Sequence, residues 1–210
     1  MTLEQIAIKH KTQKVPHGYM PIYERHFESM RDEKIILIEI GVAEGASVRT
    51  WADYFSKGKI IGLEKYGDNV VNFDYDGQGN VLVIECDVSS EREIDRVGIK
   101  ERFPQVDIII DDGSHWAYEQ LNAFKFLWDN LKPGGWYVIE DLFTLYDPIW
   151  NPKPHYNIID EIKKRIDSIL VEGDLIQEVH IYGRNNINGI MFLRKRSEEF
   201  RIQPLEEFNI

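Results

Sequence analysis

Two apolar segments that end in acidic residues constrain the fold of this chain more than any other feature. They are residues 106–115 (VDIIIDDGSH) and residues 134–141 (GGWYVIED). Ile108, Ile109 and Ile110 are consecutive, so they cannot all lie on one face of an amphipathic strand. An apolar run of this length, followed by turn residues and a helical pattern, is typical of a strand buried on both faces of a parallel sheet.

The rest of the chain alternates strand and helix patterns, which predicts an α/β, Rossmann-like fold with helices on both faces of a mostly parallel sheet. The predicted parallel strands are residues 35–40, 59–64, 81–85, 107–110 and 136–139, and residues 175–182 and 189–194 read as a C-terminal antiparallel hairpin. The predicted helices are residues 2–10, 22–30, 48–55, 114–130 and 158–170, with Thr2 and Ser114 as N-caps. Residues 91–100 are expected to form a short helix or a turn, and residues 66–80 mostly a loop. We expect one domain, made of an N-terminal lid or substrate segment (1–34), a core (35–194) and a tail (195–210).

Composition excludes several classes of protein. The net charge of −11 argues against nucleic acid as the main partner, because phosphate binding depends on Lys and Arg. The single cysteine, Cys86, rules out a disulfide within the chain and favours a reducing cytoplasm. No apolar stretch approaches the roughly 20 residues of a membrane helix, and the first residues lack the apolar core of a signal peptide.

A glycine turn after the first strand indicates a cofactor site. Gly41, Gly45 and Ser47 follow the strand and precede a helix, a geometry that lets the main chain approach a ligand closely. The spacing is neither the GxGxxG dinucleotide fingerprint nor a P-loop. Glu39, inside the apolar strand, is expected to bond the turn amides or a water, with a purely structural acid as the alternative.

Acids at the ends of the next two strands extend this site. Glu64 lies about 20 residues after the turn, where an acid accepts hydrogen bonds from ribose hydroxyls. Asp87 either accepts from an adenine amino group or caps the following helix. His17, Tyr19 and Tyr23, ahead of the first strand, either close over a ligand or anchor their loop to the core.

The acids after the fourth and fifth strands suggest a metal centre. Asp111, Asp112, His115, Glu140 and Asp141 fall at the carboxyl ends of neighbouring strands, where ligands bind in open α/β sheets. Four acids without nearby basic residues in sequence need a cation to offset their repulsion, and hard oxygen ligands suit Mg²⁺, Ca²⁺ or Mn²⁺. The alternative is that these residues only cap a helix and form a turn.

These motifs together resemble a known family. The ExGxxxG turn of residues 39–45, Glu64, Asp87 and the LKPGG of residues 131–135 resemble the class I S-adenosylmethionine-dependent methyltransferases. Residues 11–27 (KTQKVPHGYMPIYERHF), the DDGSH of residues 111–115 and the VIED of residues 138–141 resemble, more narrowly, the metal-dependent macrolide sugar O-methyltransferases of the mycinamicin and demethylmacrocin type. Gln13 departs from the family's KTDK pattern.

The resemblance implies roles for particular residues. Asp112, Glu140 and Asp141 would bind magnesium, and His115 would be the general base, so that His115 and Asp112 are the expected catalytic residues. The expected cofactor-binding residues are Glu39, Gly41, Gly45, Ser47, Glu64, Asp87, Asp111 and Tyr19. The family carries an additional N-terminal domain that this sequence does not contain, so we expect its acceptor and its assembly to differ; a homo-oligomer is compatible with this interpretation.

The expected function is therefore transfer of a methyl group from S-adenosylmethionine, assisted by Mg²⁺ or another hard divalent cation, to a hydroxyl of a small molecule. A sugar or glycoside in natural-product or surface-glycan tailoring is the first choice of acceptor. The alternatives are a phenolic or catechol acceptor and a non-catalytic cofactor-binding module, since Trp116, Phe143, Tyr146 and Trp150 suit either a phenol or a sugar face. A nicotinamide-dependent oxidoreductase is disfavoured by the missing GxGxxG.

Overall fold

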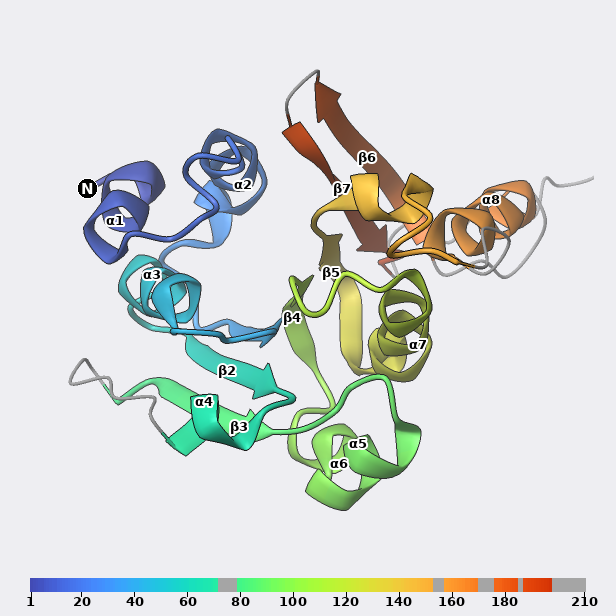
Figure 1. Ribbon diagram of the computed structural model, residues 1–210. Helices are drawn as coiled ribbons and strands as arrows, with labels where there is room; N and C mark the ends of the chain where they lie inside the picture. Colours follow the sequence, from blue (N-terminus) through green and yellow to red (C-terminus); the bar gives the residue numbers. More distant parts are fainter. Residues whose placement is uncertain (72–78, 153–156, 170–175, 185–186, 198–210) are drawn as a thin grey trace, which may run out of the picture.

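The computed structural model describes residues 1–71, 79–152, 157–169, 176–184 and 187–197. One seven-stranded sheet runs through the molecule in the order β3-β2-β1-β4-β5-β7-β6 (Figure 1). The strands are β1 (Ile36–Ile40), β2 (Lys59–Glu64), β3 (Val81–Glu85), β4 (Val106–Asp111), β5 (Leu131–Ile139), β6 (Ile176–Arg184) and β7 (Ile187–Lys195). The first five pair in parallel, whereas β7 pairs antiparallel with both β5 and β6. The predicted fold class is confirmed.

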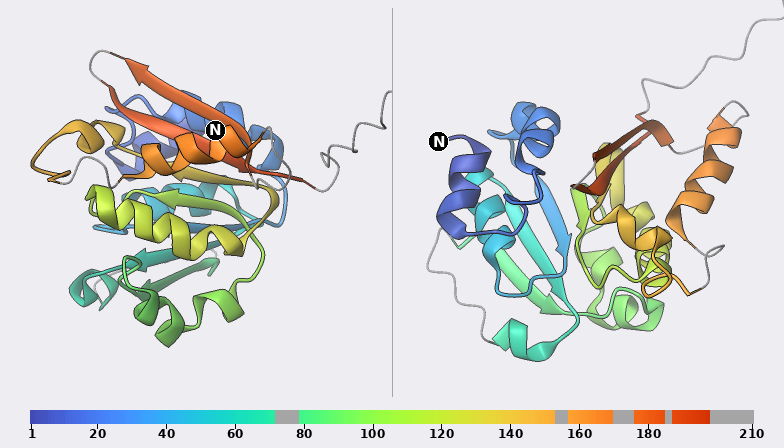
Figure 2. Two further views of the ribbon diagram at one scale, coloured as in Figure 1. Left: turned by 90° about the vertical axis from the view of Figure 1, so that its right-hand side faces the viewer. Right: turned by 45° about the horizontal axis from the view of Figure 1, so that its top comes forward.

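Helices cover both faces of this sheet (Figure 2). One face carries α1 (Leu3–His10), α2 (Met20–Phe27) and α3 (Ala46–Tyr54). The other face carries α5 (Glu91–Val97), α6 (Ile99–Arg102), α7 (Ala117–Leu127) and α8 (Ile158–Ile169). The short elements are α4 (Gly67–Val71) and the 3₁₀ helices η1 (Glu28–Met30), η2 (Trp128–Asn130) and η3 (Leu142–Tyr146). No helix among the described residues has the length and apolar character needed to cross a membrane.

The three consecutive isoleucines of β4 explain the two-sided core. Ile108 and Ile110 pack into the cluster under α1, α2 and α3, whereas Ile109 packs into the cluster under α7 and α8. All three side chains are fully buried. The continuous apolar pattern therefore arises because the alternating side chains of one central strand serve two cores.

Local differences from the sequence prediction have identifiable causes. Residues 67–71 form the short helix α4 within the stretch predicted to be mostly loop. Ser114 is not the N-cap of α7; Trp116 is, because His115 adopts a left-handed conformation (φ 62°) that cannot belong to a helix. Ser114 Oγ instead donates to Glu119 Oε2 at 2.6 Å. Thr2 does cap α1, within a capping box completed by Gln5.

The turns after β1 and β4 touch each other, and Gly41 makes this contact possible. Its φ is +86°, and a Cβ at this position would overlap the main-chain carbonyl of Asp112. The main-chain N–H of Asp112 donates to the carbonyl of Ile40 at 3.1 Å, so the two strand ends are joined. Any residue other than glycine would push the predicted cofactor turn away from the predicted metal ligands.

We expect Gly41→Ala to lower the free energy of unfolding by about 2–4 kcal/mol, because it combines a steric overlap with a left-handed backbone. Urea denaturation measures this effect. The matched control is Gly183→Ala, since a Cβ at Gly183 meets no atom within 4 Å. Equal stability of the two variants would contradict the close approach described here.

His26 joins α2 to the antiparallel end of the sheet. Its ring stacks on Phe192 at 4.0 Å between centroids, and its Nε2 lies 3.0 Å from the Tyr182 hydroxyl. Burial, reinforced by the nearby His180 and Arg25 and opposed by Glu178, lowers the pKa of His26 to about 4. The folded protein therefore keeps this imidazole neutral at a pH where the unfolded chain protonates it.

Stability should consequently fall as the pH drops from about 6.5 to about 4, because only the unfolded state gains the proton in this window. Since His26 is only about half buried, we expect it to contribute about 1–2 kcal/mol to the loss. Urea denaturation at pH 7.5 and pH 4.5 tests this with His26→Phe, which retains the stacked ring. A variant that loses as much stability in acid as the wild type would show that His26 is not responsible.

Candidate active site

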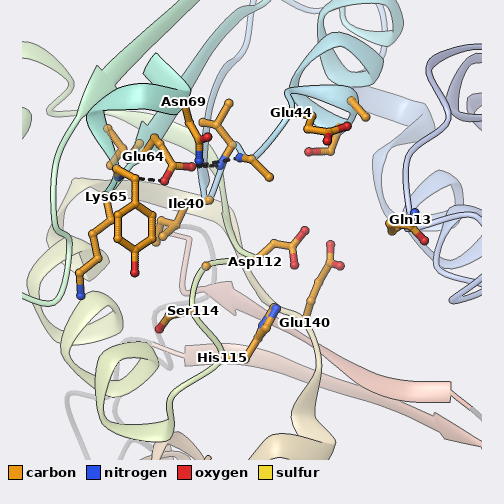
Figure 3. A pocket seen from close by; sticks show the side chains of 18 of the residues that line it. Gln13, Ile40, Glu44, Glu64, Lys65, Asn69, Asp112, Ser114, His115 and Glu140 are labelled. Carbon is orange, nitrogen blue, oxygen red and sulfur yellow. Dashed lines mark hydrogen bonds between the residues drawn. The ribbon is translucent and has the colours of Figure 1, made fainter. Parts of the chain in front are cut away.

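A cavity of about 680 Å³ opens where β1, β2, β3 and β4 end (Figure 3). Its walls come from the turn after β1, the ends of β2 and β3, the DDGSH turn after β4, and the loop before α2. This volume suits a nucleotide-sized ligand. Among the residues predicted from the sequence, those that line it are His17, Gly41, Ser47, Glu64, Asp87, Asp112, His115, Glu140 and Asp141.

Glu64 organises the glycine turn. Its Oε2 accepts the main-chain N–H groups of Val42 at 2.9 Å and Ala43 at 3.0 Å, and its Oε1 accepts that of Tyr66 at 3.0 Å. Ala43 has a φ of 46°, a left-handed conformation in a non-glycine residue. The acid predicted to bind ribose thus also holds the cofactor turn in a strained shape at the cavity wall.

Glu39 has a different role from the one expected. Its carboxylate accepts hydrogen bonds from Ser47 Oγ at 2.7 Å and from Trp51 Nε1 at 3.1 Å, not from the turn amides, which Glu64 takes. Burial, partly offset by Lys14, raises the pKa of Glu39. Glu39 and Gly45 do not line the cavity, so they support its wall from behind.

Asp87 lines the cavity, and its carboxylate interacts with two residues near it in space, Ser89 and Lys65. Its Oδ1 accepts from the Ser89 N–H at 3.0 Å and the Ser89 hydroxyl at 2.7 Å, and its Oδ2 lies 3.1 Å from Lys65 Nζ. The N-cap of α5 is Ser90, so Asp87 is not the cap residue itself. Partial burial raises the pKa of Asp87, but the hydrogen bonds from Ser89 and Lys65 outweigh it and hold the pKa below its usual value.

The acidic half of the cavity brings Asp112, His115 and Asp141 together. One potential ligand atom from each lies within 4.8 Å of the others. His115 Nε2 is 3.5 Å from Asp141 Oδ2, while His115 Nδ1 is buried without a hydrogen-bond partner among the described residues. His115 and Asp141 both have left-handed backbones, with φ of 62° and 57°. Such strain in two non-glycine residues is typical of sites shaped for function.

Two tyrosines of the N-terminal segment donate hydrogen bonds to acids of the site. Tyr19 donates to Asp141 Oδ1 at 2.8 Å, and Tyr23 donates to Glu140 Oε1 at 2.5 Å. Both rings are fully buried, whereas His17 lines the cavity. The structure thus places Tyr19 behind Asp141 and outside the cavity lining, which does not support its predicted contact with a cofactor.

Asp111 also points away from the cavity. It is 2% exposed, it accepts a weak bond from the Gly113 N–H at 3.4 Å, and its Oδ2 has no partner among the described residues. Burial raises its pKa to about 7. Asp111 is therefore positioned to support the DDGSH turn rather than to touch a ligand.

Lys14 is a functional-site residue that was not predicted from the sequence. Its side chain is 3% exposed, and Nζ contacts Asp112 Oδ2, lies 2.6 Å from Glu140 Oε1 and lies 3.3 Å from Glu39 Oε1. The acids were expected to lack a basic partner because none is close in sequence, but Lys14 reaches Asp112 from 98 residues away. The one sequence feature that could have identified Lys14 as a site residue is its place in the KTQK segment, which resembles the family's KTDK pattern.

No family model matches this sequence, but several curated O-methyltransferases are similar to it. The chain is 33% identical to the mycinamicin VI 2''-O-methyltransferase of Micromonospora griseorubida over 63% of its own length and 33% of that protein. It is 34% identical to the 8-demethyl-8-alpha-L-rhamnosyl tetracenomycin-C 2'-O-methyltransferase of Streptomyces olivaceus, over 70% of its length and 39% of that protein. The chain therefore spans about a third to two fifths of these curated relatives.

Solved structures agree with this similarity. The MycE methyltransferase of the mycinamycin biosynthetic pathway, solved in complex with Mg, SAH and mycinamycin VI, superposes with a TM-score of 0.80 at 28% identity, over 98% of this chain and 57% of that one. An SAH-bound methyltransferase of Podospora anserina, at 16% identity and a TM-score of 0.59, shares the fold over 93% of this chain and 88% of that one. The predicted resemblance to the macrolide sugar O-methyltransferases is confirmed.

Deleting the Tyr23 hydroxyl should destabilise the protein. Tyr23→Phe leaves the buried Glu140 with one donor fewer, and we expect a loss of about 1.5–3 kcal/mol in the free energy of unfolding, measured in urea with chelator present. The matched control is Tyr54→Phe, because the Tyr54 hydroxyl is also buried but has no partner among the described residues. If both variants lose the same amount, the bond to Glu140 carries no stability.

Proposed function

We propose that this chain is an S-adenosylmethionine-dependent, divalent-metal-assisted O-methyltransferase that acts on a hydroxyl of a sugar or glycoside. One observation supports this proposal above the others: a single cavity connects the glycine turn and Glu64 with the cluster of Asp112, His115 and Asp141. A donor nucleoside and an acceptor hydroxyl would meet at the junction. The mycinamicin VI and the rhamnosyl tetracenomycin-C enzymes, to which this chain is similar, are named as sugar O-methyltransferases of this kind.

The cofactor would occupy the half of the cavity formed by the ends of β1, β2 and β3. Gly41 allows the main chain to approach it, Glu64 would accept from its ribose hydroxyls, and Asp87 lies where an adenine amino group would donate. Glu39, through Ser47 and Trp51, keeps α3 fixed against the turn. The donor methyl group would then face the DDGSH turn.

The acidic half fits a hard divalent cation. Asp112 and Asp141 offer carboxylate oxygens into the same space, and Figure 3 shows Asp112, Glu140 and His115 turned toward one part of the cavity. We assign Asp112, Glu140 and Asp141 as the ligands, in keeping with the resemblance. When bound, the ion would lower the energy of the negative charge that develops on the acceptor oxygen.

His115 would accept the proton of the acceptor hydroxyl. The base would be Nε2, the ring nitrogen 3.5 Å from Asp141 Oδ2, because Nδ1 is buried and out of reach of an acceptor. The bound cofactor would supply the methyl group and leave as S-adenosylhomocysteine, and His115 would hold the proton of the acceptor hydroxyl. The protein positions the acceptor and removes its proton, while the cofactor carries the reactive group.

Aromatic side chains beside His115 would hold the acceptor. The Trp150 ring lies 6.4 Å from the His115 ring and 5.8 Å from the Trp116 ring, and Phe143 and Tyr146 are exposed on η3. These faces suit a sugar ring, and a flat phenol is the second candidate. We further propose that the described residues form one methyltransferase domain of a cytoplasmic protein with a small-molecule partner, in which residues 1–34 form part of the acceptor side.

Isothermal titration of S-adenosylmethionine and S-adenosylhomocysteine, with Mg²⁺ and with chelator, tests this proposal. We expect both to bind, together with a separate saturable Mg²⁺ event that Asp112→Asn abolishes and the surface control Asp95→Asn retains. Cofactor binding without any Mg²⁺ event would refute the metal role. Absence of cofactor binding would refute the methyltransferase assignment itself. Turnover of glycosides but not catechols would then fix the acceptor class.

A further inference from the structure

The ammonium of Lys14 lies between the two carboxylates that the proposed function assigns to a metal ion. It contacts Asp112 Oδ2 and lies 2.6 Å from Glu140 Oε1. Figure 3 shows these two carboxylates facing the same part of the cavity. Glu140 is not one of the three residues whose ligand atoms converge, and its Oε1 accepts hydrogen bonds from Lys14 and Tyr23.

A buried lysine needs partners of this kind. Burial alone lowers the pKa of Lys14, but Asp112, Glu140 and Glu39 outweigh it and raise the pKa well above the usual value. Three carboxylates surround Nζ of Lys14, so its ammonium is the cationic partner of these acids. It offsets one of the formal negative charges of Glu39, Asp112, Glu140 and Asp141, which would otherwise repel one another in a buried place.

The same space cannot hold both cations. Mg²⁺ binds oxygen at about 2.0–2.1 Å, so an ion shared by Asp112 and Glu140 would lie close to where Nζ lies now. Two positive charges about 3 Å apart in a buried site repel strongly. One of them has to leave, and the lysine is the one carried on a loop.

We infer that Lys14 and a divalent cation are alternative occupants of the Asp112–Glu140 pair, so that metal binding releases Lys14 into the cavity. The inference rests on the metal site of the proposed function. It gives the N-terminal segment a specific role, since Lys11, Thr12, Gln13 and His17 line the same cavity. Metal loading would then change the cavity wall formed by this loop before cofactor and acceptor react.

Titration of Mg²⁺ into Lys14→Met, without cofactor, tests the competition. Methionine keeps the length of the side chain and removes its charge. We expect the variant to bind Mg²⁺ at least about fivefold more tightly than the wild type, to melt at a lower temperature in chelator, and to gain more in melting temperature from Mg²⁺. Lys14→Arg should behave as the wild type does. Lys9→Met, which removes an exposed lysine paired with Asp53, is the matched control.

The outcomes separate the two hypotheses. If the wild type binds Mg²⁺ and Lys14→Met binds it equally or more weakly, the competition is refuted while the metal site of the proposed function stands. If neither the wild type nor any variant binds Mg²⁺, the metal site itself is refuted, and the competition with it.

A second measurement needs only the wild-type protein, in case Lys14→Met does not fold. Acetylation of lysines, followed by mass spectrometry of peptides, reports how accessible each ammonium is. In chelator we expect Lys14 to react far more slowly than the exposed Lys11, and Mg²⁺ should raise the rate at Lys14 by about tenfold or more relative to Lys11. A Lys14 rate that saturating Mg²⁺ leaves unchanged would refute its release.

Discussion

Buried negative charge at one edge of the sheet is the constraint on which the rest of this structure depends. Parallel strands end at the same edge, so the acids at the carboxyl ends of β1, β4 and β5 converge there. Glu39 and Glu140 are almost completely buried, and carboxylates in such a place require donors or a cation. The chain supplies Ser47 and Trp51 to Glu39. The N-terminal segment supplies the donors for the other acids.

This charge explains why a segment outside the parallel sheet is so deeply packed. Lys14, Tyr19 and Tyr23 each place a polar group on a carboxylate of the site, and the two tyrosine rings join the core under α3. The same contacts hold the loop of residues 11–18 over the cavity. Stability and access to the site are therefore controlled by the same few side chains.

Much of this arrangement could be predicted from the sequence, because it depends on local patterns. The strand bounds at β2 and β3, the hairpin of β6 and β7, and the grouping of Asp112, His115 and Asp141 follow from periodicity and from the geometry of parallel strands. What could not be predicted depends on three-dimensional proximity. The amides of the glycine turn were expected to donate to Glu39, but they donate to Glu64. The reason is that β2 lies beside β1 and presents its last side chain to that turn.

Two further differences have the same origin. Ser114 has the residue type of an N-cap, but the left-handed backbone of His115 starts the helix later. Lys14 has no spacing relation to the acids, so no periodicity reveals it. Local chemistry thus predicts where side chains gather, and tertiary contacts decide which of them pair.

The position of Lys14 also changes how this protein can be divided. A boundary between residues 34 and 35 looks natural in the sequence, because the first strand begins there. A fragment cut at that point, or a chimaera that joins this sheet to another N-terminal segment, would keep every acid of the site and lose the residues that hold those acids together. The smallest transferable unit therefore begins before Lys14, and recombination between relatives has to exchange the first 34 residues together with the strand ends that they neutralise.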